Sequence, residues 1–292
     1  MQSLWMLLAA LFFASMGVCV KFASSHFNSA ELIFYRGLVG VLILGMLSRT
    51  QGVSLATRFA GLHVWRSVVG VASLGAWFYA LAHLPLATAM TLNYMSSVWI
   101  AAFLVGGSLL LGRAQRQGPL VLVVMLGFVG VVLMLHPTFD HRQAFAGMIG
   151  LLSGISAAFA YMQVMALTRL GEPETRIVFY FSVGSVVAGA LSMTITGMSP
   201  WIWPSALWLL PIGVLASLGQ LCMTRAYGHG ATLVVANLQY SGIVFAAIYG
   251  ITLFGDIIPL MGWAGMGLIV ISGIAATVMR EHAVPHAPAE EH

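Results

Sequence analysis

The chain is built from apolar segments about as long as a bilayer is thick, joined by short polar connections. A helix needs about 20 apolar residues to cross the hydrocarbon core of a bilayer. We predict ten such helices, at about 3–23, 30–48, 62–82, 86–110, 118–135, 144–168, 175–197, 206–227, 231–254 and 258–279. The predicted fold is therefore an all-α polytopic membrane protein.

Composition excludes the soluble alternatives. Apolar residues make up 60% of the chain and charged residues 7%, whereas soluble domains have about 45–50% and about 25%. The net charge of +4 does not indicate nucleic-acid binding, because the twelve Lys and Arg residues are scattered singly along the chain. We therefore expect a lipid bilayer around the protein and no nucleic-acid partner.

The distribution of Lys and Arg predicts the orientation. With ten helices, both termini lie on the same side of the membrane, and that side would carry most of the basic residues. Cytoplasmic loops are enriched in Lys and Arg, so we expect both termini in the cytoplasm and the protein in a bacterial inner (plasma) membrane. The side of the termini would carry Arg49, Arg58, Arg66, Arg113, Arg116, Arg169, Arg176, Arg225 and Arg280, and the other side Lys21, Arg36 and Arg142.

The two halves of the sequence resemble each other. ALAHLPLATAMTLNYMSS at 80–97 aligns with AYGHGATLVVANLQYSGI at 226–243. Each half would contain five helices, and an odd number inverts the second copy relative to the first. We predict two inverted-topology repeats, residues 1–140 and 141–280, followed by a disordered cytoplasmic tail at 281–292.

Three sequence segments are similar to a known family. They are FYR in the second predicted helix, WFYALAHLPLATAMTLNY in the third and fourth, and TRAYGHGATLVVANLQYSGIVFAAIYGITLFGD in the eighth and ninth. The chain resembles EamA-type transporters of the drug/metabolite transporter superfamily over nearly its whole length. The resemblance implies a central cavity between the halves, with the fifth and tenth helices peripheral. It also implies export of amino acids, aromatic ones included, or of other metabolites. Many relatives carry Glu where this chain has Arg113 and Asp256.

Polar and aromatic side chains within the predicted helices are candidates for the substrate path. Large polar groups are costly in lipid unless they face the protein interior or water. Two such pairs, Asn93–Tyr94 and Gln239–Tyr240, occupy equivalent positions in the two halves. Two alternatives stay open, since hydroxyl and small residues also pack helices together and aromatic rings also fill interiors. The predicted substrate-binding residues are Lys21, Arg36, Trp77, Asn93, Tyr94, Trp99, Gln163, Gln220, Gln239 and Tyr240.

The charges in the first two helices favour a substrate with a carboxylate. The first helix has Lys21 and no acidic residue, so a lipophilic cation would find no counter-charge there. A zwitterion or an anion could approach Lys21 or Arg36. The alternatives are that Lys21 extends toward the membrane surface, and that Arg36 pairs with Glu31 or with backbone carbonyls.

These features favour a secondary transporter that moves a small metabolite by alternating access. An amino acid or similar zwitterion with an aromatic or hydrophobic side chain is favoured, as is export. Alternatives are an uptake carrier for another metabolite and a passive facilitator or channel. An enzyme is not expected, because the sequence has no HExxH, no CxxC and no acid pair within the helices. We expect no cofactor and no metal site, and small-residue patterns in the helices leave a homodimer open.

Overall fold

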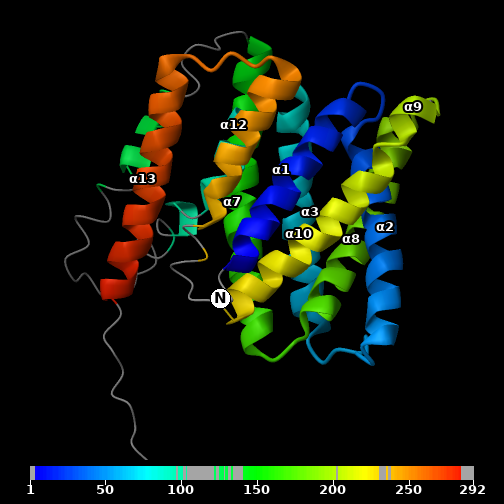
Figure 1. Ribbon diagram of the computed structural model, residues 1–292. Helices are drawn as coiled ribbons and strands as arrows, with labels where there is room; N and C mark the ends of the chain where they lie inside the picture. The colour runs from blue at the N-terminus through cyan, green and yellow to red at the C-terminus, as the bar shows by residue number, and fades with distance from the viewer. Residues whose placement is uncertain are drawn as a thin grey trace, which may run out of the picture.

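The computed structural model is a bundle of helices (Figure 1). It describes residues 4–96, 98–100, 141–201, 203–229 and 238–283, and single positions within 103–133 and at 235. Within this part of the chain all regular structure is helical. The helices are α1 (Trp5–Ala23), α2 (Ser29–Thr50), α3 (Ala60–His83), α4 (Leu86–Tyr94), α7 (His141–Arg169), α8 (Glu174–Thr196), α9 (Trp203–Ala206), α10 (Leu209–His229), α12 (Ser241–Phe254) and α13 (Leu260–Ala283).

Six of the described helices are long and apolar enough to cross a bilayer. They are α1, α2, α3, α7, α8 and α10, while α12 and the start of α13 form shorter apolar helices. This confirms a multi-pass, all-helical membrane protein. More than half of the fifth predicted helix, 118–135, lies outside the described residues, so the count of ten stays a prediction.

The predicted helix ends are wrong at several points. In the fourth predicted helix, 86–110, α4 ends at Tyr94, and Met95, whose backbone keeps a right-handed helical conformation, leads on to further helical residues at 96 and 98–100. In the predicted helix 231–254, Tyr240 likewise precedes the start of α12. Helix α13 continues to Ala283, into the segment predicted as a tail, whose residues 284–292 lie outside the described part.

Local sequence explains where several helices begin and end. Asn28 caps α2, since its side chain accepts a hydrogen bond from the Glu31 N–H (3.0 Å) and its own N–H donates to the Glu31 carboxylate (2.8 Å). Pro173 precedes α8, where the missing N–H of proline is tolerated. Helix α12 ends at Gly255, whose φ of +64° favours glycine.

The helices pack in a set of specific pairs. α2 lies along α8, α3 along α7, and α1 along α10, while α4 contacts both α7 and α12. Glycines allow the closest of these approaches. A Cβ on Gly37 of α2 would lie 2.8 Å from the Val186 nitrogen of α8, and one on Gly154 of α7 would lie 2.5 Å from the Leu92 oxygen of α4.

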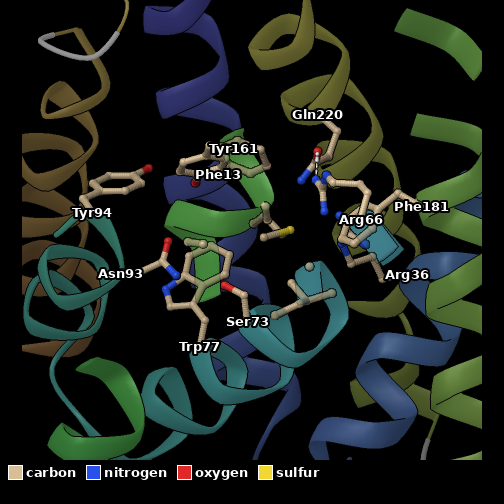
Figure 2. Close-up of a pocket in the computed structure, with 15 residues that line it drawn as sticks. Phe13, Arg36, Arg66, Ser73, Trp77, Asn93, Tyr94, Tyr161, Phe181 and Gln220 are labelled. Atoms are coloured by element: carbon tan, nitrogen blue, oxygen red, sulfur yellow. Dashed lines mark hydrogen bonds between the residues drawn. The ribbon is translucent and has the colours of Figure 1, made fainter. Parts of the chain in front are cut away.

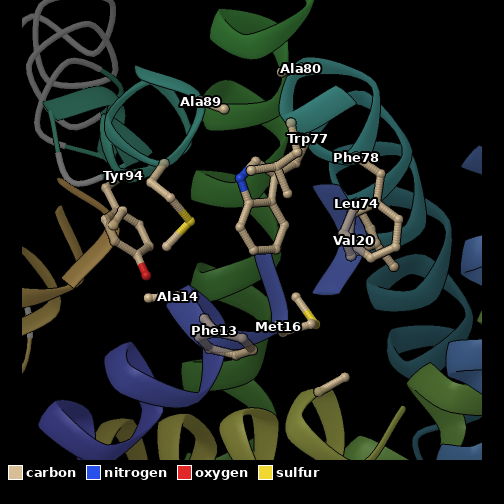
Figure 3. Close-up of a cluster of buried hydrophobic side chains, with 14 of the residues drawn as sticks. Phe13, Ala14, Met16, Val20, Leu74, Trp77, Phe78, Ala80, Ala89 and Tyr94 are labelled. Atoms are coloured by element: carbon tan, nitrogen blue, oxygen red, sulfur yellow. The ribbon is translucent and has the colours of Figure 1, made fainter. Parts of the chain in front are cut away.

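The apolar core lies where α1, α3 and α4 meet (Figure 3). Met16, Phe78 and Leu81 are fully buried there. Trp77 and Tyr94 flank this core, so the same helices that form it also hold polar atoms toward the neighbouring cavity. The start of α1 and the end of α13 both lie in the lower part of Figure 1, and α1 and α7 run in opposite directions.

Candidate functional site

A small cavity lies in the middle of the bundle, between helices from both halves of the chain (Figure 2). Its free volume is about 50 Å³, enough for a few water molecules. The residues lining it come from α1, α2, α3, α4, α7, α8 and α10. They are Phe13, Met16, Arg36, Arg66, Gly70, Ser73, Leu74, Trp77, Asn93, Tyr94, Ala157, Ala160, Tyr161, Phe181 and Gln220.

Two arginines and one aromatic ring form one side of the cavity. The guanidinium carbons of Arg36 and Arg66 lie 5.0 and 4.2 Å from the centre of the Phe181 ring, within the range of cation–π attraction. Arg36 donates to the Ser185 hydroxyl (3.4 Å) and Arg66 to the Gln220 amide oxygen (3.5 Å), both at long distance. Both arginines are buried, with 4% and 3% of their surface exposed.

Much of the hydrogen-bonding capacity of these arginines is unused. Nε of Arg36, and Nε and Nη1 of Arg66, have no hydrogen-bond partner among the described residues. Neither arginine takes part in an ion pair within the described chain. A buried charge without a partner is strongly unfavourable, so this side of the cavity is suited to an anionic group.

A polar network on the opposite side holds Asn93 in place. The Asn93 amide donates to the Ser153 hydroxyl (3.1 Å), and the Ser73 hydroxyl donates to the Ser153 carbonyl (2.9 Å). Gly154 lets α7 approach the backbone of α4 at this point. The indole N–H of Trp77 and the hydroxyl of Tyr94 are buried and have no partner among the described residues. This side therefore offers neutral polar atoms and aromatic faces.

The second polar pair, Gln239 and Tyr240, is placed differently from the first. The Tyr227 hydroxyl donates to the Gln239 amide oxygen (3.0 Å). The Tyr227 ring in turn lies 5.8 Å from that of Tyr161, which lines the cavity. Gln239 therefore supports the cavity from one layer behind, and Tyr240 lies beside the groove between α12 and α13.

The structure brings half of the predicted substrate-binding residues together. Arg36, Trp77, Asn93, Tyr94 and Gln220 line the cavity. The other five do not line it: Lys21, Trp99, Gln163, Gln239 and Tyr240. A role in substrate binding stays a prediction for all ten residues.

The charged residues near the ends of the first two helices have other partners than those considered from the sequence. Glu31 does not pair with Arg36, because it accepts from the N–H and hydroxyl of Ser199 (2.7 and 2.6 Å). Lys21 does not simply extend toward the surface, because its ammonium group lies 3.5 Å from the carboxylate of Asp256 and 3.3 Å from the Leu84 carbonyl.

Sequence reasoning missed Arg66 and Phe181, and it did not include Tyr161 among the predicted substrate-binding residues. Arg66 was assigned to the cytoplasmic side of the membrane, but the structure buries it in the cavity. Its spacing could have shown this, since Arg66, Gly70 and Ser73 follow one another on one face of α3 at intervals of four and three residues.

Each end of the bundle carries a charged cluster outside the cavity. At one end, Asp256 accepts from the backbone N–H of Leu86 (3.1 Å) and meets Lys21. At the other end, the carboxylate of Glu172, in the connection between α7 and α8, contacts Thr57 (2.9 Å), His63 (3.1 Å) and Arg176 (3.2 Å). Burial alone would raise the pKa of Glu172, but these hydrogen bonds together outweigh it and lower the pKa below its ordinary value.

Comparison with known proteins places this architecture among membrane transporters. The chain is 33% identical over 274 residues to the pseudopaline exporter CntI of Pseudomonas aeruginosa, covering 92% of this chain and 93% of that protein. It is 25% identical to a riboflavin transporter of Vibrio cholerae (92% and 90% covered). It is 23% identical to an S-adenosylmethionine uptake transporter of Rickettsia prowazekii (86% and 84% covered).

A solved crystal structure shares the fold, with a TM-score of 0.67 and 16% identity over 97% of this chain and 99% of the other. The sequence model of the EamA-like transporter family matches residues 1–136. The resemblance found in the sequence is thereby confirmed. With this match and a full-length relative at 33% identity, the chain belongs to the EamA-like transporter family.

Proposed function

We propose that this protein is a secondary transporter that moves an amino acid or similar zwitterion out of the cell by alternating access. The observation that supports this most directly is the central cavity, where guanidinium groups and the Phe181 ring face neutral polar atoms across a small space. The substrate carboxylate would bind the guanidinium group of Arg36. An aromatic or aliphatic side chain would pack against Trp77 and Tyr161.

Many transporters that work by alternating access are built from two related halves, and the helix pairs support such an arrangement here. If the second half repeats the first, α7, α8, α10 and α12 correspond to α1, α2, α3 and α4. The contact of α1 with α10 then has its counterpart in that of α7 with α3, and both pairs occur. The pairs α2–α8 and α4–α12 each join a helix to its equivalent in the other half. The opposite directions of α1 and α7 fit an inverted repeat.

The small volume of the cavity fits one stage of such a cycle. About 50 Å³ is too little for an amino acid, so the helices around it must separate to admit one. The charged cluster of Lys21 and Asp256 joins the end of α1 to the segment after α12. We assign this end to the outer side of the inner membrane, with both termini in the cytoplasm.

Counterflow in liposomes tests the proposal. Purified protein is reconstituted with unlabelled amino acids inside and labelled ones outside, with and without a pH gradient. We expect transient accumulation of label for a preferred amino acid, and its loss in the Asn93→Ala variant with Ser24→Ala as a control outside the cavity. Passage of label without trans-stimulation would instead indicate a passive facilitator. Direction is tested in cells, where the uptake function named for one relative predicts accumulation and the proposed export predicts the reverse.

A further inference from the structure

We propose that Arg36 and Arg66 select substrates that carry two separate carboxylates, one for each guanidinium. This inference rests on the proposed function and defines its substrate class more narrowly. It concerns Arg66 above all, since a single carboxylate on Arg36 would satisfy an ordinary amino acid.

The charges around the cavity are not balanced within the described structure. Four carboxylates have described side chains, and each is engaged elsewhere: Glu31 with Ser199, Glu172 with Arg176, Glu174 with His229 and Asp256 with Lys21. Asp140, Glu281, Glu290 and Glu291 complete the acidic residues of the sequence, and they fall in segments whose side chains are not described. Within the described structure, the cavity therefore carries two positive charges and no negative one.

The guanidinium groups of Arg36 and Arg66 are held by different helices. Arg36 lies on α2 and donates a hydrogen bond to Ser185 of α8, whereas Arg66 lies on α3 and donates one to Gln220 of α10. The two guanidinium groups thus have separate anchors, although both face Phe181 (Figure 2). Each guanidinium also keeps its own free N–H groups, Nε of Arg36 and Nε and Nη1 of Arg66, so each can donate hydrogen bonds to a carboxylate.

The two buried guanidinium charges favour a ligand that compensates both of them. Arginine keeps its proton in proteins, so a bound monocarboxylate would leave one buried guanidinium uncompensated. A second carboxylate removes that unfavourable charge and adds charge-assisted hydrogen bonds, which are the stronger kind. We expect these charge-assisted hydrogen bonds to raise the affinity for a dicarboxylate about tenfold or more over that for a monocarboxylate.

A matched pair of probes tests the inference. L-phenylalanine and 4-carboxy-L-phenylalanine differ by one carboxylate on the same aromatic ring, and O-phospho-L-tyrosine replaces it with a phosphate. Affinity is measured for the purified protein from the ligand-dependent rise in Tm, and exchange is measured by counterflow. We expect about tenfold tighter binding of the dicarboxylate than of phenylalanine in the wild type.

The variant Arg66→Gln should abolish this preference and leave phenylalanine binding largely unchanged. Arg225→Gln is the matched control, because Arg225 lies over the Trp5 ring away from the cavity and its loss should leave the preference intact. In the absence of ligand, Arg66→Gln should melt at the same temperature as the wild type or higher, since a buried unpaired charge has been removed. A purely structural role for Arg66 would instead lower this Tm.

Equal affinity of the wild type for both probes, or an equal loss for both in Arg66→Gln, would overturn the inference, as would a lack of binding by either. Tighter binding of the phosphate than of the dicarboxylate would also overturn it, in favour of a phosphorylated substrate. Binding with the expected preference but without exchange would leave this inference standing and refute the proposed transport of such compounds.

Discussion

The close contact between α2 and α8 makes a quantitative prediction about Gly37. A Cβ at this position would lie 2.8 Å from the Val186 nitrogen, 2.9 Å from the Ser182 oxygen and 2.9 Å from the Ser185 Cβ. Ordinary contacts begin at about 3.4 Å, so the two helices would have to separate by several tenths of an ångström. Two of the three atoms belong to backbone and cannot rotate away. Gly37→Ala should therefore destabilise the protein.

The same helix provides a matched control. A Cβ on Gly45 would have its nearest neighbour at 3.8 Å, the ring of Phe179. Both Gly→Ala changes gain the same helix propensity of about 0.5–1 kcal/mol. The difference between the two variants therefore isolates the cost of overpacking, about 1–3 kcal/mol. At roughly 2–4 °C per kcal/mol, Gly37→Ala should melt several degrees below Gly45→Ala.

Thermal unfolding of both variants in the same detergent, followed by tryptophan fluorescence, measures this difference. The protein has eight tryptophans, so no label is needed. A Tm for Gly37→Ala equal to or above that of Gly45→Ala would refute the packing of α2 against α8 described above.

Three further predictions concern the groups around the cavity and at the two ends of the bundle. Asp256→Asn removes the charge that meets Lys21, whose side chain is 18% exposed, and should lower Tm by an amount that corresponds to about 1 kcal/mol. The double variant Asp256→Asn with Lys21→Met should lose little more stability than the single variant. Additive losses would show that the pair does not interact. Tyr227→Phe removes the hydrogen bond to Gln239 and should cost about 1–2 kcal/mol of stability and reduce transport, and an unchanged Tm would contradict the bond. Because the pKa of Glu172 is lowered in the folded protein, its contribution to stability is present above its ordinary pKa of 4.5 and is lost as the pH falls through the folded value, so Tm should fall less steeply on acidification in Glu172→Gln than in the wild type.

Apolar segment length predicted the class of fold because the bilayer imposes it. The segments 3–23 and 175–197 correspond closely to α1 and α8, since any stretch of that length and composition must be helical in lipid. Hydropathy could not show that α4 ends at Tyr94, because an apolar residue in a turn contributes to a hydropathy average just as one in a helix does. It also could not show that Gly154 of α7 lies close against the backbone of α4, since such an approach depends on the packing of whole helices.

The candidate site was predictable only in part, for a similar reason. Asn93 and Arg36 stood out because a large polar side chain within an apolar segment needs a specific partner. Arg66 lies near the start of its segment, where a basic residue is usual, so position along the chain concealed its burial. Gln239 has the same sequence signal as Asn93, yet it lies behind Tyr227 and Tyr161, and only the packing of whole helices separates the two cases.

The seam between α2 and α8 is fastened at both of its ends. At one end Asn28 and Glu31 hold the segment after α8, through Gly197 and Ser199. At the other end Glu172 holds Thr57, in the segment between α2 and α3, and His63 in the first turn of α3. These two helices come from different halves of the chain, so the contacts oppose separation of the halves along this seam. We therefore expect the helices farthest from the seam to move most when the cavity opens.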